Sequence, residues 1–155
     1  RQQVENLKKL PGAINSTLKL ESEIQLIAKE FLDAKGSMFL GRGNSFPIAL
    51  EGALKLKELS YLHAEGYPAG EMKHGPLALI EEGLPVIVIA PKDKYYEKTL
   101  SNMQEVIARG GKIFFITDNN NRLLNDKGVP YNLVHQYDKR WDEFSYNFQK
   151  FIENL

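Results

Sequence analysis

Residues 84–90 read LPVIVIA, a run in which four consecutive side chains are β-branched. A strand with one face in water alternates apolar and polar residues, so an unbroken apolar run predicts a strand that is covered on both faces. Parallel strands packed between helices have this pattern. KIFFIT at residues 112–117 is a second run of this kind, and SMFLG at residues 37–41 is a shorter one that ends in a glycine turn.

The segments around these strands have the spacing of helices. Ser22–Gly36 repeats apolar side chains every three to four residues and stops at a glycine. Two further helices are expected at about residues 46–63 and 98–111, and residues 131–137 form a weaker candidate strand. Because strands and helices alternate, we expect an α/β fold of parallel strands with helices on both faces. Ligands of such sheets bind beyond the carboxyl ends of the strands.

The expected organisation is a single domain over residues 1–155. Its parts are a helical lead-in, a core and a final helix, at about residues 1–36, 37–137 and 139–155. A hydrophobic fraction of 43% in 155 residues is enough for one compact core. The chain begins without Met, and we expect it to be a piece of a larger protein.

Composition narrows the class of protein. Twenty basic and twenty acidic residues leave no net charge, so nothing favours nucleic acid or an anionic membrane as a partner. The absence of cysteine excludes disulfides, a thiol nucleophile and a thiolate metal site. No apolar run reaches membrane-spanning length, and the first ten residues lack the apolar core of a signal peptide. We therefore expect a cytoplasmic protein.

A narrow line of charges marks the helix expected at residues 46–63. Glu51, Lys55 and Glu58 fall within about 60° of one another at 100° per residue. Such a trio is commonly a set of surface ion pairs worth a few tenths of a kcal/mol. The alternative is a carboxylate held beside an ammonium at the wall of a cleft, where it does acid–base work. Periodicity alone favours the surface pairs.

The segment AEGYPAGEMKHGP, residues 64–76, holds three glycines and two prolines and is expected to be a rigid loop. It presents His74, and histidine exchanges protons near neutral pH, although a surface histidine is an equally good interpretation. His63 with Glu65, and Glu71 with His74, have short spacings, but zinc needs three or four converging ligands. We expect no metal and no cofactor.

The turn GRGNSF, residues 41–46, follows the first expected strand. Its glycines and Ser45 resemble a phosphate-binding turn before a helix, which makes Gly43 and Ser45 weak candidates for contacting substrate. Phe46 replaces the last glycine of the dinucleotide fingerprint, so that motif is absent. A plain turn with Ser45 capping the helix explains the residues equally well. Arg42 is suited either to a phosphate or to a carboxylate.

FLGRGNSFPIALEGALKLKELSYLHAEGYPAGEMKHGPLALIEEGLPVIVIAP, Phe39–Pro91, closely resembles the second sugar-isomerase (SIS) domain of the glutamine–fructose-6-phosphate aminotransferases, also called glucosamine-6-phosphate synthases. A looser likeness continues to about Asp118, and the last 37 residues match poorly. The resemblance implies a three-layer αβα sandwich with a parallel, flavodoxin-like doubly wound sheet. It also implies a role in converting fructose 6-phosphate and glutamine-derived ammonia to glucosamine 6-phosphate.

The same resemblance assigns roles to three of the candidate residues. Glu58 is similar to the family's acid/base that moves a proton between C1 and C2, and Lys55 to the lysine beside it. His74 is similar to the histidine that assists ring opening and is supplied to a neighbouring subunit's site. These residue types suit an aldose–ketose interconversion. A homodimer is therefore expected.

Parts of the family's machinery are missing from this sequence. They are the phosphate-gripping loops of the first SIS domain, the glutaminase domain with its cysteine nucleophile, and the lysine-bearing C-terminal tail. We therefore expect a domain of a composite site that does not catalyse the whole reaction alone. Two alternatives stay open, a regulatory SIS module that binds a phosphosugar without chemistry and a stand-alone phosphosugar isomerase or deglycase.

Overall fold

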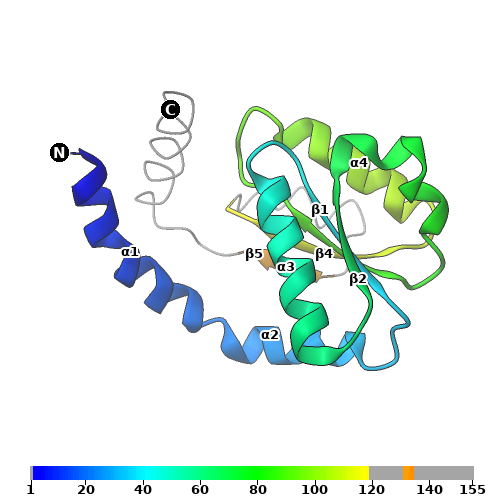
Figure 1. Ribbon diagram of the computed structural model, residues 1–155, viewed down its shortest axis with the longest axis horizontal. Helices are drawn as coiled ribbons and strands as arrows, with labels where there is room; N and C mark the ends of the chain where they lie inside the picture. Colours follow the sequence, from blue (N-terminus) through cyan, green and yellow to red (C-terminus); the bar gives the residue numbers. More distant parts are fainter. Residues whose placement is uncertain (1, 119–130, 135–155) are drawn as a thin grey trace.

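The computed structural model describes residues 2–118 and the backbone of residues 131–134. Five parallel strands of these residues form one sheet in the order β2-β1-β3-β4-β5 (Figure 1). Their bounds are Ser37–Gly41 for β1, Ala64–Pro68 for β2, Pro85–Ile89 for β3, Lys112–Thr117 for β4 and Tyr131–Val134 for β5. The order reverses between β1 and β3, which makes the carboxyl ends of these two strands the topological switch point.

Helices lie on both faces of the sheet, and the expected three-layer α/β architecture is confirmed. The α-helices are α1 (Gln2–Leu18), α2 (Glu21–Ala28), α3 (Ser45–Ser60) and α4 (Tyr96–Ile107); the 3₁₀ helices are η1 (Lys29–Phe31), η2 (Ala69–His74) and η3 (Pro76–Leu79). α1 extends away from the sheet, whereas α3 packs on it (Figure 1). None of the helices within residues 2–118 is long and apolar enough to cross a membrane.

The expected strand at residues 84–90 and helix at 98–111 are found with shifted ends, as β3 and α4. The segment expected as one helix at residues 22–36 is shorter, because α2 tightens into η1 and the chain then turns into β1. Of the weaker strand expected at residues 131–137, the first four residues form β5. The remainder of that strand and the helix expected at residues 139–155 lie outside the described residues.

The prediction of a loop over residues 64–76 is wrong. Its first five residues form β2, an edge strand paired with β1 from Ser37↔Ala64 to Gly41↔Pro68, and η2 and the start of η3 follow. Gly66 and Pro68 disfavour a strand in isolation, but an edge position tolerates proline. Gly66 is required by packing, since a Cβ there would lie 2.9 Å from the Leu50 Cα of α3.

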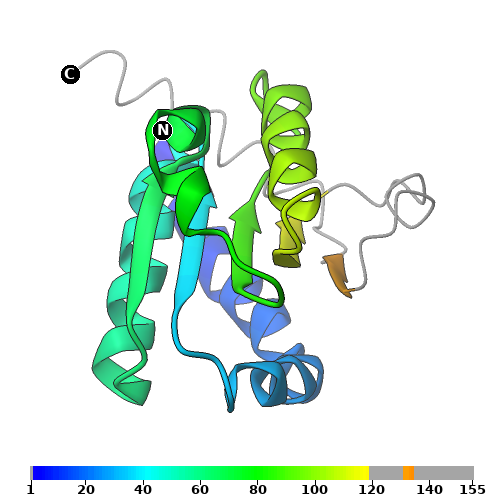
Figure 2. The same ribbon diagram turned by 90° about the vertical axis from the view of Figure 1, so that its right-hand side faces the viewer.

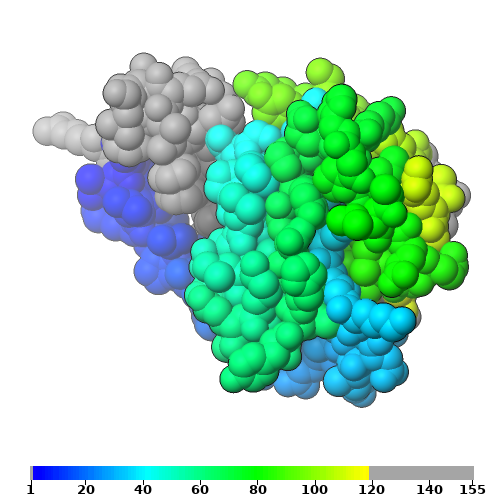
Figure 3. Space-filling model, turned by 45° about the vertical axis from the view of Figure 1, so that its right-hand side comes forward, coloured from blue at the N-terminus to red at the C-terminus, as the bar shows by residue number. Residues whose placement is uncertain are grey.

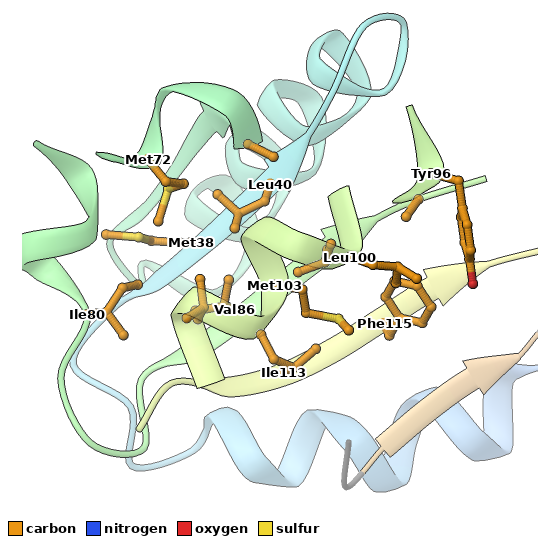
Figure 4. Close-up of a cluster of buried hydrophobic side chains, with 14 residues drawn as sticks. Met38, Leu40, Met72, Ile80, Val86, Tyr96, Leu100, Met103, Ile113 and Phe115 are labelled. Atoms are coloured by element: carbon orange, nitrogen blue, oxygen red, sulfur yellow. The ribbon is translucent and has the colours of Figure 1, made fainter. Parts of the chain in front are cut away.

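The larger core lies between the sheet and α4. Its side chains are buried and converge from β1, β3, β4, α4, η2 and the turn after η3, as Figure 4 shows for Met38, Leu40, Met72, Ile80, Val86, Tyr96, Leu100, Met103, Ile113 and Phe115. Full burial of such a side chain contributes roughly 1.5–3 kcal/mol. On the opposite face Ala49 and Ala53 of α3 are buried, and the Phe31 ring lies 4.8 Å from that of Phe114.

The turn between β1 and α3 requires glycine at position 41. A Cβ on Gly41 would lie 2.1 Å from the Ser45 carbonyl oxygen, which is backbone and has no rotamer by which to move away. Gly41→Ala is therefore expected to lower the free energy of unfolding by about 1–3 kcal/mol or more. Gly12→Ala is the matched control, because nothing lies within 4 Å of a Cβ there. Chemical denaturation of both variants measures the effect; equal stabilities would contradict this turn geometry.

Candidate active site

The charged line of α3 forms ion pairs on the surface of the described chain. Lys55 Nζ lies 2.6 Å from Glu58 Oε2 and 3.7 Å from Glu51 Oε1. About half of the Lys55 and Glu58 side-chain surface is exposed, 52% and 49%. The outer face of α3 is on the surface of the molecule (teal to green in Figure 3). Helical spacing alone produces this arrangement, since the three residues stand at i, i+4 and i+7.

Lys55 is held as a cation. Its hydrogen bond to Glu58 and then the charge of that carboxylate raise the pKa of the Lys55 ammonium above its ordinary value, and Glu51 adds to the effect. The pair therefore presents a full positive charge directly beside a carboxylate oxygen. A carboxylate can accept a proton, and an adjacent ammonium stabilises negative charge that develops on a substrate oxygen.

His74 is the last residue of η2, a 3₁₀ helix that is held in place by buried side chains and by an ion pair to α4. Ala69 and Met72 are completely buried, and Lys73 Nζ lies 3.0 Å from Glu105 Oε1 on α4. The His74 side chain itself is 76% exposed, with Nε2 4.0 Å from Glu71 Oε2. Gly75 follows at φ +140°, a conformation that ends the 3₁₀ turn and requires glycine. The imidazole thus points to solvent from a fixed backbone.

The structure brings Lys55 to Glu58 but does not bring His74 to either of them. α3 begins beyond the carboxyl end of β1 and runs back to the opposite edge of the sheet, where β2 starts (Figure 2). Glu58 is near that end of α3, whereas His74 comes after the far end of β2. β2 alone spans about 13 Å, from four steps of about 3.3 Å. The described chain therefore keeps these groups near opposite ends of β2.

A second cluster lies at the switch point between β1 and β3. Arg42 Nη1 donates a hydrogen bond to Asn102 Oδ1 (3.2 Å), and its guanidinium lies 5.9 Å from the Tyr95 ring centroid. Lys94 Nζ lies 5.2 Å from the same centroid. From the sequence, Arg42 could pair with a phosphate or with a carboxylate. Within the described part of the chain it instead donates its hydrogen bond to the side-chain amide of Asn102.

The structure places Gly43 and Ser45 in the same turn. Gly43 has φ +56°, and a Cβ there would lie 2.5 Å from the Tyr95 ring, so the backbone closely approaches that side chain. Ser45 is the first residue of α3 and is buried, and Asn44 before it makes no side-chain capping bond. These two residues therefore share the switch point with Arg42, far from the Lys55–Glu58 pair.

Contacts around η2 and β2 are among those that were not foreseen from the sequence. The Lys73–Glu105 ion pair joins residues distant in the chain, so no local pattern reveals it. Another is a short hydrogen bond from the Tyr67 hydroxyl to the Glu65 carboxylate, with His63 Nε2 3.5 Å from the other oxygen of Glu65. In residues 2–118 no three His, Asp or Glu side chains are grouped so that they could hold a metal ion.

The Tyr67–Glu65 bond gives a titration prediction. Donating this bond to the Glu65 carboxylate, and to a lesser extent burial, raises the pKa of Tyr67 above the ordinary tyrosine value of about 10. Because the folded-state pKa is the higher one, the bond stabilises the fold below about pH 10 and is lost as pH rises through the raised pKa. In an alkaline titration of the seven tyrosines, the phenolate absorbance should therefore contain a component that appears only above the ordinary tyrosine pKa, and Tyr67→Phe should remove it. Tyr61→Phe, at a 93% exposed position, should leave it unchanged; a late component in both variants would contradict the assignment.

Comparison with known proteins gives a consistent result. The family described as the SIS domain matches residues 30–128. The glutamine–fructose-6-phosphate aminotransferase (isomerizing) of Bartonella henselae is 60% identical over 115 residues, which are 74% of this chain and 19% of that protein. This chain therefore spans about a fifth of the length of the curated relatives it matches.

Solved structures agree with the sequence relatives. The C-terminal domain of glucosamine-fructose-6-phosphate aminotransferase from Francisella tularensis superposes with a TM-score of 0.76 at 46% identity, over 83% of this chain and 36% of that chain. The tagatose-6-phosphate ketose/aldose isomerase of Escherichia coli superposes with a TM-score of 0.57 at 20% identity, over 79% of this chain and 38% of that chain. The second likeness concerns the fold alone.

Proposed function

This chain belongs to the SIS domain family, and from that premise we propose that it is the second SIS domain of a glutamine–fructose-6-phosphate aminotransferase. The observation that carries the proposal is the Lys55–Glu58 pair, 2.6 Å apart, within a chain that is 60% identical over 115 residues to such an enzyme. In this role the domain contributes acid–base groups to the conversion of fructose 6-phosphate and glutamine-derived ammonia to glucosamine 6-phosphate.

Each member of the pair has a defined task in this proposal. The Glu58 carboxylate accepts the proton that leaves one of C1 and C2 and returns it to the other, so that the group ends the cycle unchanged. The Lys55 ammonium faces the oxygen on which negative charge develops as the enediol forms. Gly43 and Ser45, at the carboxyl edge of the sheet, are weak candidates for a separate contact with substrate.

His74 completes the site from a second copy of the chain. The separation of His74 from Glu58 within one chain supports this arrangement, since ring opening requires a proton shuttle at the sugar that is being isomerised. The exposed apolar side chains of α3 support a homodimer, because a helix of a monomer rarely exposes so many of them to solvent. They are Ile48, Leu50, Leu54 and Leu59, and the exposed Tyr61 follows directly after the helix. The remaining proposed partners are a glutaminase domain, a first SIS domain and the phosphosugar, in the cytoplasm.

A domain exchange tests the proposal. The 115 residues of this chain that align with the Bartonella henselae enzyme replace their counterpart in it, and glucosamine 6-phosphate formation is measured. Activity within about tenfold of the parent, a difference of about 1.4 kcal/mol in the barrier, supports the role of an aminotransferase domain. The isolated 155-residue chain is the matched control and should form no product.

The same experiment separates the alternatives. A chimera that binds fructose 6-phosphate but forms no product would favour a regulatory SIS module. Isomerisation of phosphosugars by the isolated chain would favour a stand-alone isomerase, for which the fold shared with the Escherichia coli isomerase is the supporting observation. Either result would overturn the proposed function.

A further inference from the structure

The 3₁₀ helix η2 has three distinct faces. With three residues per turn, its side chains at i and i+3 lie above one another. Ala69 and Met72 form the first face; both are completely buried, and Met72 points into the core (Figure 4). Glu71 and His74 form the second face, which is exposed to solvent. The third face therefore decides how η2 is turned about its buried face, and thus where the His74 imidazole is presented.

Gly70 and Lys73 form this third face, which is tied to α4. Lys73 Nζ lies 3.0 Å from Glu105 Oε1 on α4. A Cβ on Gly70 would lie 3.1 Å from Arg42 Nη1, the nitrogen that donates a hydrogen bond to Asn102 on α4. Asn102 and Glu105 stand at i and i+3, so one side of α4 receives both contacts. η2 is thus held at two levels along one helix.

Glu105 differs from the carboxylates of the exposed ion pairs. Its side chain is 24% exposed, whereas Glu51 and Glu58, which pair with Lys55, are about half exposed or more. Its Oε2 atom is buried and has no hydrogen-bond partner among the described residues. A carboxylate in this position has lost much of its hydration, so its charge depends on the Lys73 ammonium. We therefore expect the pair to hold Lys73 in one place, which an exposed pair does not do.

We propose that Glu105 is a positioning residue for His74. Through Lys73, its carboxylate fixes the rotation of η2 and so the place at which the imidazole is presented to the sugar phosphate in a second copy's site. The inference rests on the proposed function, in which His74 acts across subunits. Lys73 and His74 are adjacent, so holding the Lys73 side chain holds the backbone from which His74 projects. A reacting group that is misplaced by about 1 Å can lower a rate by about 10²-fold.

Amide hydrogen exchange of the 155-residue chain tests whether the pair holds η2. Lys73→Met leaves Glu105 without its cation and should speed exchange of the η2 amides several-fold, because local opening no longer breaks the pair. Exchange of the β3 amides should not change, since Ala69 and Met72 stay buried and keep the domain folded. Lys73→Arg preserves the pair and should keep the slow exchange. Glu97→Gln is the matched control, because it neutralises an exposed carboxylate of α4; it should change neither element.

Mixed dimers of the domain-exchange chimera test whether the pair acts through His74. A Glu58→Gln subunit supplies an intact His74, and a His74→Ala subunit supplies an intact Glu58. Lys73→Met in the subunit that supplies His74 should lower the restored turnover by about ten- to hundredfold, with a smaller change in KM. Glu105→Leu in that subunit should give the same loss, and the two substitutions together should give no further loss. Lys73→Met in the subunit that supplies Glu58 should have little effect.

The position of the substitution separates positioning from stability. An equal loss with Lys73→Met in either subunit assigns the pair to stability alone and overturns the proposal, as does no loss in either subunit or unchanged exchange of the η2 amides. A mixture that is inactive before Lys73→Met is added contradicts the proposed function, and the role of Glu105 in catalysis with it. The hydrogen exchange still decides in that case whether Glu105 holds η2, so the two failures are distinguished.

Discussion

Glu58→Gln lowers the turnover of the domain-exchange chimera by about 10²- to 10⁴-fold, the range typical of general acid–base groups. The amide has the shape of the carboxylate but cannot accept the proton that moves between C1 and C2. It also keeps a hydrogen-bonding oxygen toward Lys55, so the surface of α3 is little disturbed. The loss is therefore expected in turnover and not in stability, since exposed ion pairs contribute only about 0–1 kcal/mol.

Glu51→Gln is the matched control for this prediction. Glu51 is the second carboxylate on Lys55, at 3.7 Å, on the same helix and with a similar exposure. A general effect of the charge on Lys55 would lower turnover in both variants, whereas a specific proton transfer by Glu58 lowers it only in Glu58→Gln. Equal effects of the two substitutions would assign these residues to surface electrostatics, the interpretation that periodicity alone favours.

The fold was largely predictable because two of its strands, β3 and β4, consist mainly of apolar side chains. VIVI in β3 and IFFI in β4 predict buried strands, and their alternation with helical segments predicts a parallel sheet between helices. β2 was missed because Gly66 and Pro68 weaken a strand by local propensity. Its pairing with β1 is decided by tertiary contact, in which Gly66 lets the strand approach the backbone of α3.

In the candidate site, too, contacts between residues close in the sequence were predictable, whereas contacts made by tertiary packing were not. Lys55 and Glu58 are neighbours by helical geometry, so their contact was predictable from spacing. Tyr67 and Glu65 stand at i and i+2, which places them on one face of a strand, and their bond would have been predictable had β2 been recognised. Lys73 and Glu105 meet only because η2 packs on α4, which spacing cannot show.

Mixing two inactive chimeras restores activity if His74 acts across subunits. Glu58→Gln and His74→Ala variants are each inactive alone, because every site in either homodimer lacks one group. Random exchange of subunits makes half of the dimers heterodimers, and one of the two sites in each heterodimer receives an intact Glu58 and an intact His74. About one quarter of the parental activity should therefore return, as expected for a two-fold symmetric dimer.

The distance between the two groups decides how this experiment is interpreted. Within one chain Glu58 lies near the end of α3 that precedes β2, and His74 lies beyond the carboxyl end of β2, so the described chain does not hold the two groups together. A mixture of Glu58→Gln with the Glu58→Gln, His74→Ala double variant is the control, since no dimer in it has an intact Glu58, and it should stay inactive. If the complementing pair stays equally inactive after subunit exchange has been verified, then His74 does not act on a partner's site, and its exposed position on η2 belongs to a surface histidine.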